Sequence, residues 1–457
     1  MNQHGKKRST FSGKLGFVLS AAGASVGLGN IWRFPYLAAK YGGGIFFIIY
    51  IALTLTFGYT MIIAETSLGR MTRKSPVGAY QSFGKSRWLS FGGWINAIIP
   101  LLIVPYYSVI GGWVIKYLIE YLMGHAESLA EDGYFGEFIS GGVSAEICFI
   151  IFMLITVVII YSGVRNGVER VSKFMMPILV VLAVVIMVYS VTRPGALAGV
   201  KYFLIPQPEN FSWMTVVTAM GQMFYSLSIA MGILVTFGSY MKDDVSIEKS
   251  TVNVEIFDTA IAVMAGLMII PAVFSFSGGD AETLQAGPSL MFITIPKVFA
   301  SMGFGSIVGV LFFFLVLCAA LTSSIALTES AVSTFEDELG WGRKKSVVIL
   351  AGIMFVLGSL SSLGYGPLQG MKILGMACLD FFDFLTNSVM MPIAAIATCF
   401  LVTKVIGIDK IDKEMTKENG TFKRKRIFVF MIRFMCPIFA TIILISSIAN
   451  AFGWISM

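Results

Sequence analysis

Long apolar stretches recur along the chain and are separated by short polar segments. Each is long enough, at about 20 residues, for a helix to cross the hydrocarbon core of a bilayer. The runs are continuous rather than alternating, which favours helices over the strands of a membrane barrel. The pattern therefore predicts an all-α membrane protein with eleven transmembrane helices. Their expected ranges are 14–39, 43–69, 89–123, 144–163, 168–191, 213–240, 248–276, 297–336, 346–363, 375–403 and 427–454.

The amino-acid composition leads to the same class. Of the 457 residues, 56% are hydrophobic and 13% are charged, whereas soluble domains contain about 25% charged residues. No polar stretch is long enough for a soluble domain, so we expect the function to lie within the membrane. The polar segments divide the chain into a cytoplasmic N-terminal segment (1–13), a membrane core (14–403), a cytoplasmic linker (404–426) and an eleventh transmembrane helix (427–457).

The basic residues predict the orientation in the membrane. With the N-terminus inside, 26 of the 33 Lys and Arg fall on or near the inner side, as the positive-inside rule requires. The acidic stretch 127–137 then lies outside. We therefore expect a cytoplasmic N-terminus and an external C-terminus. Because basic loops account for the net charge of +7, no nucleic-acid partner is expected.

Cysteine and histidine offer little for catalysis. The two histidines lie outside the apolar segments, and there is no HExxH motif and no CxxC pair. The scattered cysteines all fall in apolar segments, which is typical of core packing rather than of a disulfide framework. We expect neither an enzyme nor an organic cofactor. The cysteines are Cys148, Cys318, Cys378, Cys399 and Cys436.

Two predicted spans, the first and the sixth, are interrupted near their middle by small and polar residues. Broken helices expose carbonyls for cations and N–H groups for a carboxylate at the bilayer midplane. The alternative is a face on which glycines let two helices pack closely. The interrupting residues are Gly23, Ser25, Gly27, Gly29 and Asn30 within 16–35, and Ser226, Ser228 and Gly232 within 221–232.

Four charged residues, Arg33, Glu65, Asp258 and Asp383, lie within predicted spans. A charge at the bilayer centre costs about 2.5–3.5 kcal/mol on insertion scales, and such residues usually pair or line a pathway. This number of buried charges makes a purely structural bundle a poor explanation.

Residues 23–36, GASVGLGNIWRFPY, resemble the first-helix signature of the neurotransmitter:sodium symporter family. Further matches follow in order along nearly the whole chain. The resemblance implies the leucine-transporter fold, in which spans 1–5 and 6–10 are inverted repeats. Eleven spans rather than twelve indicate a bacterial subgroup and hence a bacterial inner (plasma) membrane. The matches are KYGGG (40–44), ETSLGR (65–70), PYY (105–107), GVER (167–170), GQ (221–222) with SLS (226–228), LTSS (321–324) and FEDE (335–338).

The family resemblance also implies two sodium sites. Sodium site 2 resembles a cage of the Gly23, Val26 and Ala319 carbonyls with the Thr322 and Ser323 hydroxyls. Such hydroxyls also commonly satisfy carbonyls of their own helix. Sodium site 1 resembles the Ser25 carbonyl, the Asn30 amide oxygen, Ser226 and Asp258, together with the substrate carboxylate. The family has Asn where this chain has Asp258, and a shifted register would use Asn253 instead.

The implied substrate is an amino acid. Its carboxylate would meet the Leu28 and Gly29 amides and the Tyr107 hydroxyl, and its ammonium the carbonyls of the broken helices. Gly27 stands where monoamine-carrying relatives have an aspartate, which favours amino acids. A hydrophobic or aromatic side chain suits the remaining lining, although core packing also explains Ile103 and Met231. The expected binding residues are Ser25, Gly27, Leu28, Gly29, Ile103, Tyr107, Tyr225, Ser226, Ser228, Met231, Ser324 and Leu327.

Gates are implied on both sides of this pocket. Arg33 and Asp383 resemble the outer pair, with Tyr225 as an aromatic lid. Arg8 and Asp337 resemble the inner pair. Glu65 is expected to brace the broken helices, or alternatively to carry a proton. Gly167 and Pro177 weaken the inner half of the fifth span, which we expect either to unwind during inward opening or to form a static kink.

The predicted function is sodium-coupled symport of an amino acid into the cell by alternating access. We expect it to be chloride-independent, because Asp258 places a negative charge where chloride-dependent relatives recruit chloride. An amino-acid sensor or scaffold that does not transport is the main alternative, and an ion channel is a third. The sequence indicates no particular amino acid and no oligomeric state.

Overall fold

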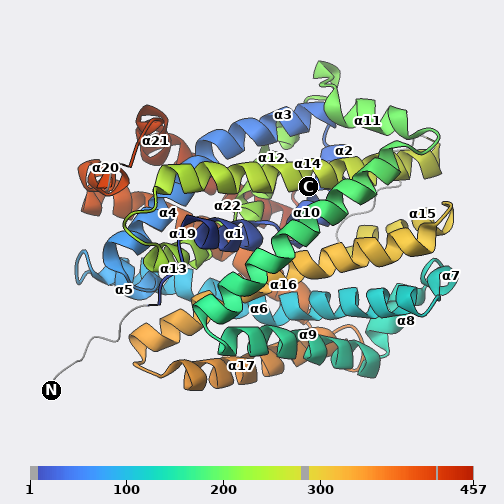
Figure 1. Ribbon diagram of the computed structural model, residues 1–457, viewed down its shortest axis with the longest axis horizontal. Coiled ribbons are helices and arrows are strands. Elements are labelled where there is room, and N and C mark those ends of the chain that lie inside the picture. The colour runs from blue at the N-terminus through green and yellow to red at the C-terminus, as the bar shows by residue number, and fades with distance from the viewer. Residues whose placement is uncertain (1–8, 279–287, 418–419, 456–457) are drawn as a thin grey trace.

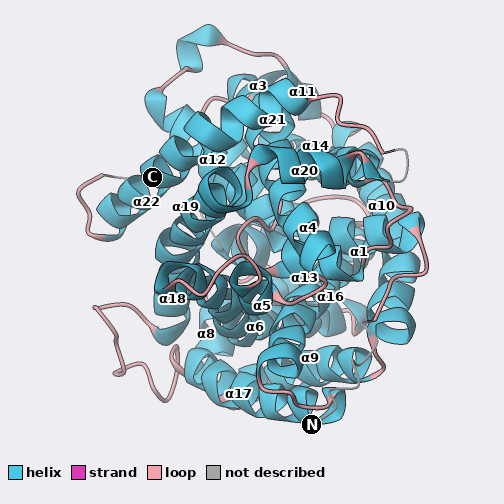
Figure 2. Cartoon of the chain, turned by 90° about the vertical axis from the view of Figure 1, so that its left-hand side faces the viewer, coloured by secondary structure: helices cyan, strands magenta, loops and turns pink. Residues whose placement is uncertain are grey.

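A computed structural model describes residues 9–278, 288–417 and 420–455, and these form a bundle of long helices (Figure 1). Apart from two isolated β-bridges, the regular structure over these residues is helical. One end of the bundle, on the left in Figure 1, carries α5, α20 and α21, while α7, α8, α11 and α15 lie at the other end. Figure 2 looks onto the left-hand end and shows the spanning helices side by side.

Within the described residues, nine helices are long and apolar enough to cross a membrane, and a bent pair makes a tenth. The continuous spans comprise α3 (Gly44–Leu53), η2 (Thr54–Gly58) and α4 (Tyr59–Thr72); α6 (Arg87–Leu122); α9 (Val143–Tyr161); η3 (Val164–Glu169) and α10 (Arg170–Val191); α14 (Ile247–Ser277); α16 (Gly305–Glu338); α17 (Arg343–Leu363); α18 (Cys378–Asp383), η7 (Phe384–Met390), α19 (Met391–Phe400) and η8 (Leu401–Ile406); and α21 (Lys425–Phe430), η10 (Met431–Met435) and α22 (Cys436–Ala451).

The two remaining predicted spans are the broken ones. In the first, α1 (Lys14–Ser25) meets the helix of η1 (Gly29–Arg33) and α2 (Phe34–Lys40) at an angle of 53°. In the sixth, α12 (Trp213–Ser226) and α13 (Ile233–Tyr240) contain 14 and 8 residues, each too short to cross alone. The breaks that glycine and serine predicted in the first and sixth spans therefore coincide with the ends of helices in the structure.

The eighth predicted span, 297–336, is wrong at its N-terminal end. The chain forms η6 (Leu290–Thr294) and α15 (Ile295–Ala300), turns, and only then enters α16. Phe304 has a φ of 61°, and a Cβ on Gly305 would lie 1.8 Å from the Phe299 carbonyl oxygen. The turn was missed because no charged residue interrupts the run at this point, although glycine and serine occupy four of the six positions in 301–306.

Short helices join the spans outside the predicted ranges. Among them, α20 lies inside the segment that the sequence presented as a plain linker. Its side chains Ile408, Ile411 and Met415 are buried, whereas its other face is polar. The short elements are α5 (Pro76–Gln81), α7 (Ala126–Leu129), α8 (Tyr134–Ser140), α11 (Ala196–Leu204), η4 (Pro208–Asn210) and α20 (Ile408–Met415).

Helices α4 and α13 approach closely because glycine faces the partner backbone on each side. A Cβ on Gly69 would lie 1.9 Å from the Val235 carbonyl oxygen, and one on Gly238 would lie 2.4 Å from the Thr66 carbonyl oxygen. Atoms cannot approach this closely, so any side chain at either position separates the two backbones. This contact holds α13, the helix that follows the break in the sixth span, beside α4.

We therefore expect Gly69→Ala and Gly238→Ala to destabilise the protein. Overpacking typically costs about 1–3 kcal/mol, and here the obstacle is backbone rather than a flexible side chain. The matched control is Gly352→Ala in α17, where a Cβ would meet nothing within 4 Å. Heat-induced aggregation of the purified protein in detergent measures the effect. If Gly69→Ala aggregates at a temperature as high as that of the control, the close contact between α4 and α13 is contradicted.

Candidate functional site

The break in the sixth span is built from strained backbone. Ser228 and Ala230 have φ values of 54° and 59°, a left-handed conformation that residues with a side chain rarely adopt. Two contacts hold it in place: the Ala230 N–H donates to Glu65 Oε1 at 2.8 Å, and the Ser228 hydroxyl donates to the Ala24 carbonyl at 3.0 Å. Buried Glu65 thus contacts the broken backbone, as expected for a brace.

A pocket lies where the two breaks meet. The structure brings almost all of the predicted binding residues together around it, and Ala24 and Ser323 join them. The space wide enough for water is about 30 Å³, which is room for only one or two water molecules. A larger ligand therefore requires the walls to move apart. The lining residues are Ala24, Ser25, Gly27, Leu28, Gly29, Ile103, Tyr107, Tyr225, Ser226, Ser228, Met231, Ser323 and Leu327.

Ser324 is the one predicted binding residue outside this lining. Its hydroxyl lies 3.2 Å from that of Thr156 on α9. Consecutive helical residues point about 100° apart, and here Ser323 faces the pocket while Ser324 faces α9. In this structure Ser323, rather than the predicted Ser324, lines the pocket.

Two glycines of the first span leave room that side chains would fill. A Cβ on Gly27 would lie 2.6 Å from Ser323 Oγ and 3.2 Å from the Tyr107 hydroxyl. A Cβ on Gly29 would lie 2.7 Å from the Tyr225 ring. The Leu28 N–H between them donates to the Tyr107 hydroxyl at 3.4 Å. The pocket thus has a backbone wall with a polar group, suited to the charged end of a small molecule.

Carbonyl oxygens converge on one side of the pocket, at Ser323. The Ser323 Oγ lies 3.4 Å from the Gly23 oxygen, 3.2 Å from the Ala24 oxygen and 3.3 Å from the Val26 oxygen. One hydroxyl proton can serve only one of these acceptors. The adjacent Thr322 hydroxyl lies 3.1 Å from the Ala319 carbonyl. The structure thus brings the predicted residues of sodium site 2 together as a cluster with more acceptors than donors, which fits a cation.

A second polar cluster surrounds Asp258 on α14. The Ser226 hydroxyl and the Asn30 amide nitrogen donate to Asp258 Oδ1 at 2.8 Å and 2.9 Å. The Tyr50 hydroxyl donates to Asp258 Oδ2 at 2.8 Å. Asp258 has no exposed surface, whereas Asn253, the alternative ligand, is partly exposed and makes none of these contacts. The geometry therefore favours the register that uses Asp258.

Sequence reasoning missed Tyr50 and placed the Asn30 amide differently. The Asn30 amide oxygen, the expected ligand, accepts from the Gly27 N–H at 3.1 Å rather than facing Asp258. Tyr50 stands in an apolar run of the second span with no motif around it. A buried tyrosine normally finds a partner for its hydroxyl, but the sequence alone does not identify that partner.

A wider cavity of about 330 Å³ lies beyond the pocket and shares Leu28, Tyr107 and Tyr225 with it. Arg33 and Asp383 both line this cavity but form no ion pair with each other. Instead, the Arg33 guanidinium lies 5.3 Å from the centroid of the Tyr225 ring. Tyr225 therefore separates the pocket from the cavity.

The predicted partner of Arg33 is held by other groups. Asp383 accepts hydrogen bonds from the Tyr106 hydroxyl at 3.1 Å and from the Asn387 amide at 2.6 Å. The predicted outer pair therefore forms no ion pair in this conformation, although both residues line the same cavity.

The opposite side of the pocket is covered by the start of the chain. The Phe11 N–H donates to the Tyr240 carbonyl at 3.1 Å, and the Ser12 N–H donates to Glu169 at 2.9 Å. Arg8 of the predicted inner gate lies outside the described residues. Its expected partner Asp337 accepts from the Ser75 N–H at 2.6 Å.

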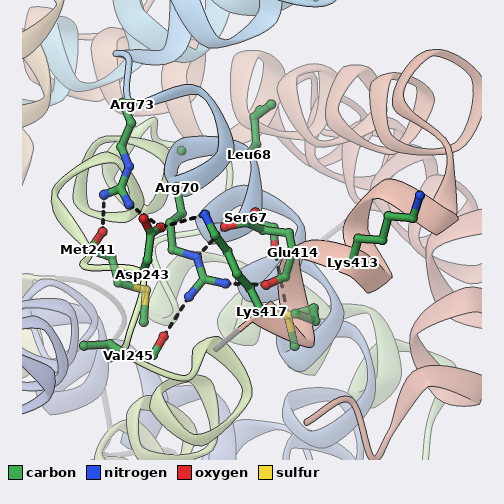
Figure 3. A network of polar contacts seen from close by, with 12 residues as sticks. Ser67, Leu68, Arg70, Arg73, Met241, Asp243, Val245, Lys413, Glu414 and Lys417 are labelled. Carbon is green, nitrogen blue, oxygen red and sulfur yellow. Dashed lines mark hydrogen bonds and ion pairs between the residues drawn. The ribbon is translucent and has the colours of Figure 1, made fainter. Parts of the chain in front are cut away.

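A polar network closes the same end of the bundle next to α4 (Figure 3). Arg70, nearly fully buried, donates to Glu414 on α20 at 2.5 Å and to the Val245 carbonyl at 2.7 Å. Asp243 receives Arg73 at 2.6 Å and Lys417 at 3.0 Å. These contacts tie α20 and the loop after α13 to α4.

Two broken spans meet at one small pocket, with a cavity on one side of the pocket and packed segments on the other. This architecture is typical of secondary transporters. Comparison with known proteins specifies the class further. A model described as the sodium:neurotransmitter symporter family matches residues 8–127 and 137–453. The chain belongs to this family, and so it is a multi-pass membrane protein and a sodium-dependent transporter rather than an enzyme.

Individual relatives agree over the full length. The chain is 33% identical to the "Uncharacterized sodium-dependent transporter YhdH" of Bacillus subtilis, covering 97% of this chain and 98% of that one. It is 30% identical to an "Uncharacterized sodium-dependent transporter" of Haemophilus influenzae, covering 98% and 100%. The structure resembles the crystal structure of MhsT in complex with L-phenylalanine, with a TM-score of 0.86, 32% identity and 96% and 100% coverage. This likeness confirms the predicted leucine-transporter fold.

The oxygen cluster at Ser323 leads to a direct prediction. We expect Ser323→Ala to raise the sodium concentration needed for half-maximal binding at least tenfold, because it removes one ligand of a small neutral cage. Ser324→Ala, one residue along and facing Thr156, is the matched control and should leave sodium binding unchanged. Sodium titration of tryptophan fluorescence in the purified protein measures both. Equal sodium affinity in the two variants would show that sodium site 2 lies elsewhere.

Proposed function

We propose that the protein carries a hydrophobic or aromatic amino acid into the cell together with sodium, by alternating access and without chloride. One observation carries this proposal: a small pocket at two broken helices lies between an acceptor-rich cluster at Ser323 and a carboxylate cluster at Asp258. The carboxylate of a zwitterion would be repelled by the oxygen atoms of these two clusters. Cations bound at the clusters would offset this repulsion, so substrate and cations are expected to bind together.

The charged end of the substrate is proposed to lie along the backbone wall. Its carboxylate meets the Leu28 and Gly29 amides and the Tyr107 hydroxyl. Its ammonium meets carbonyls at the ends of the broken helices, of Ser25 and Tyr225 among others. Gly27 supports a zwitterion over a simple amine, because position 27 carries no acidic side chain to bind an amine. A side chain at this position would also meet Ser323 Oγ at 2.6 Å.

The side chain of the substrate is proposed to enter between Ile103, Met231 and Leu327, all buried. These apolar groups favour a hydrophobic or aromatic side chain. Because the space is narrow, binding must move Met231 and Tyr225 aside, and methionine adapts well to such changes. The phenylalanine bound to MhsT is consistent with this choice.

Two sodium ions are proposed, one at each cluster. At sodium site 2 the ion would replace the single Ser323 hydroxyl proton as the partner of the Gly23 and Val26 carbonyls. At sodium site 1 it would enter among Asp258, Ser226 and Asn30, next to the substrate carboxylate and the Ser25 carbonyl. All are oxygen ligands, as a hard cation prefers, and the Asn30 amide must turn to present its oxygen.

Asp258 is proposed to take the place of chloride. Two sodium ions and a zwitterion bring excess positive charge into a site of low dielectric, where unbalanced charge is costly. At about 4 Å a unit negative charge contributes roughly 4 kcal/mol at an effective dielectric of 20. Asp258 already provides this charge at the site, whereas Ala262, one turn later, cannot.

The gates and the orientation complete the proposal. The end carrying α20 is placed in the cytoplasm of a bacterial cell and the Tyr225 cavity outside, with the N-terminus inside and the C-terminus outside. During transport Arg33 and Asp383 close over Tyr225, and the contacts of the N-terminal segment at the cytoplasmic end break.

We assign 14–403 as the transporter core, 404–426 as a cytoplasmic linker and 427–457 as the eleventh helix. Unwinding between Gly167 and Pro177 would admit water to sodium site 2.

A competition screen in proteoliposomes tests the transport itself. We expect an inward sodium gradient to drive uptake of labelled phenylalanine, with hydrophobic and aromatic amino acids as the strongest competitors among the twenty. Exchange of unlabelled for labelled substrate across the membrane would distinguish a transporter from a sensor, which shows none. Uptake that proceeds equally with potassium in place of sodium would refute the proposal.

Replacement of chloride by gluconate tests the role of Asp258. Wild-type uptake should not change, whereas Asp258→Asn should lose most of its uptake in gluconate because the compensating charge is gone. Glu255→Gln, which removes a buried acid from the same helix, is the matched control and should stay chloride-independent. A wild-type protein that stalls without chloride would overturn this assignment. An Asp258→Asn protein that remains fully active in gluconate would place the compensating charge elsewhere.

A further inference from the structure

An apolar groove of about 460 Å³ runs between α10 and α16, on the opposite side of α10 from the substrate pocket. It opens toward the bilayer, because Phe174 and Phe314 in its walls are 70% and 40% exposed. Its floor is closed by Cys318 and Leu321, which are 1% and 7% exposed. The lining residues are Arg170, Val171, Phe174, Met175, Ile178, Phe314, Leu317, Cys318 and Leu321.

The dimensions of the groove suit a lipid chain. The two helices run in opposite directions, so its α10 wall from Arg170 to Ile178 faces its α16 wall from Leu321 back to Phe314. Eight residues of helix rise about 12 Å, which is most of one leaflet of a core about 30 Å thick. Figure 1 shows α10 crossing the bundle as an outer helix, where lipid can reach it.

A free cation stands at one end of this groove. Arg170 is exposed, and its side chain forms no hydrogen bond or ion pair with any of the described residues. One turn away, Lys173 is already paired with Glu169 at 2.6 Å and contacts Ser12 at 3.0 Å. An unpaired arginine at the polar end of an apolar groove is complementary to a lipid phosphate.

We propose that this groove binds one anionic phospholipid of the cytoplasmic leaflet, with an acyl chain between α10 and α16 and its phosphate on Arg170. A zwitterionic lipid has the same chain but carries a compensating cation beside its phosphate. The proposed site therefore selects by charge at Arg170 and by shape between Phe174 and Phe314.

The lipid site adjoins sodium site 2 through α10 and α16. Leu321 in the groove precedes Thr322 and Ser323 in that cage. On the other face of α10, Met176 Sδ would lie 3.5 Å from a Cβ on Gly23. A ligand that binds this arrangement of α10 stabilises it. Under the proposed function, unwinding of α10 between Gly167 and Pro177 admits water to sodium site 2. A lipid that stabilises the wound helix therefore favours the state that retains sodium, and this consequence rests on the proposed function.

Native mass spectrometry of the purified protein tests the site without any transport. Equal amounts of phosphatidylglycerol and phosphatidylcholine are offered, and we expect wild type to retain the anionic lipid about fivefold better, from roughly 1 kcal/mol per basic residue. Arg170→Gln should abolish the preference. Arg433→Gln, an exposed arginine on η10 outside the groove, is the matched control and should keep it. Equal retention of both lipids by wild type overturns the proposal.

Two further measurements separate the parts of the inference. Ile178→Trp fills the groove and should reduce retention of both lipids; undiminished retention would show that the chain binds elsewhere. In vesicles, added phosphatidylglycerol should lower the sodium concentration for half-maximal uptake in wild type but not in Arg170→Gln. If retention is selective and this concentration does not change, the lipid site stands and its coupling to sodium is refuted. If sodium drives no uptake at all, the proposed function fails while the retention result remains valid.

Discussion

The rest of the structure depends on one constraint: backbone polar groups inside a membrane must find partners within the protein. Two spans are broken at mid-membrane, so the carbonyls and N–H groups around Val26 and Ala230 lose the partners that a continuous helix provides. Glu65 serves one of these N–H groups, and Ser228 links one break to the other. The breaks are thus held in the bundle rather than relaxed into regular helix, and they leave acceptors facing a shared pocket.

The acceptors gathered at the two breaks and at Asp258 explain why ions and substrate would bind together. At Ser323 the Gly23 and Val26 carbonyl oxygens share one hydroxyl proton, and at Asp258 a carboxylate is buried among neutral donors. Each cluster favours a cation, and each adjoins the pocket that the two breaks form. Helix α10 adds a further layer, because it separates the Gly23 backbone from the lipid-facing groove. Substrate, sodium and bilayer would therefore all act on the same few turns of helix.

Much of this could be predicted from sequence, because hydropathy marks the spans and small polar residues mark the breaks. Family motifs then indicated which residues meet at the pocket. What failed did so for identifiable physical reasons. The turn before Gly305 contains no charged residue, the Ser323 and Ser324 hydroxyls differ only in the rotation of α16, and Tyr50 carries no motif. Arg33 and Asp383 form no ion pair in this structure, and a sequence pattern does not encode the conformation in which two such residues would meet.

Equilibrium binding of labelled phenylalanine to the purified protein, titrated with sodium against choline at constant ionic strength, tests the central claim most directly. The claim is that sodium and substrate complete one site between them. Phenylalanine should then bind only when sodium is present. The factor by which sodium raises the affinity for phenylalanine should equal the factor by which phenylalanine raises the affinity for sodium, as linkage requires. Phenylalanine binding of equal affinity in choline and in sodium would contradict the account.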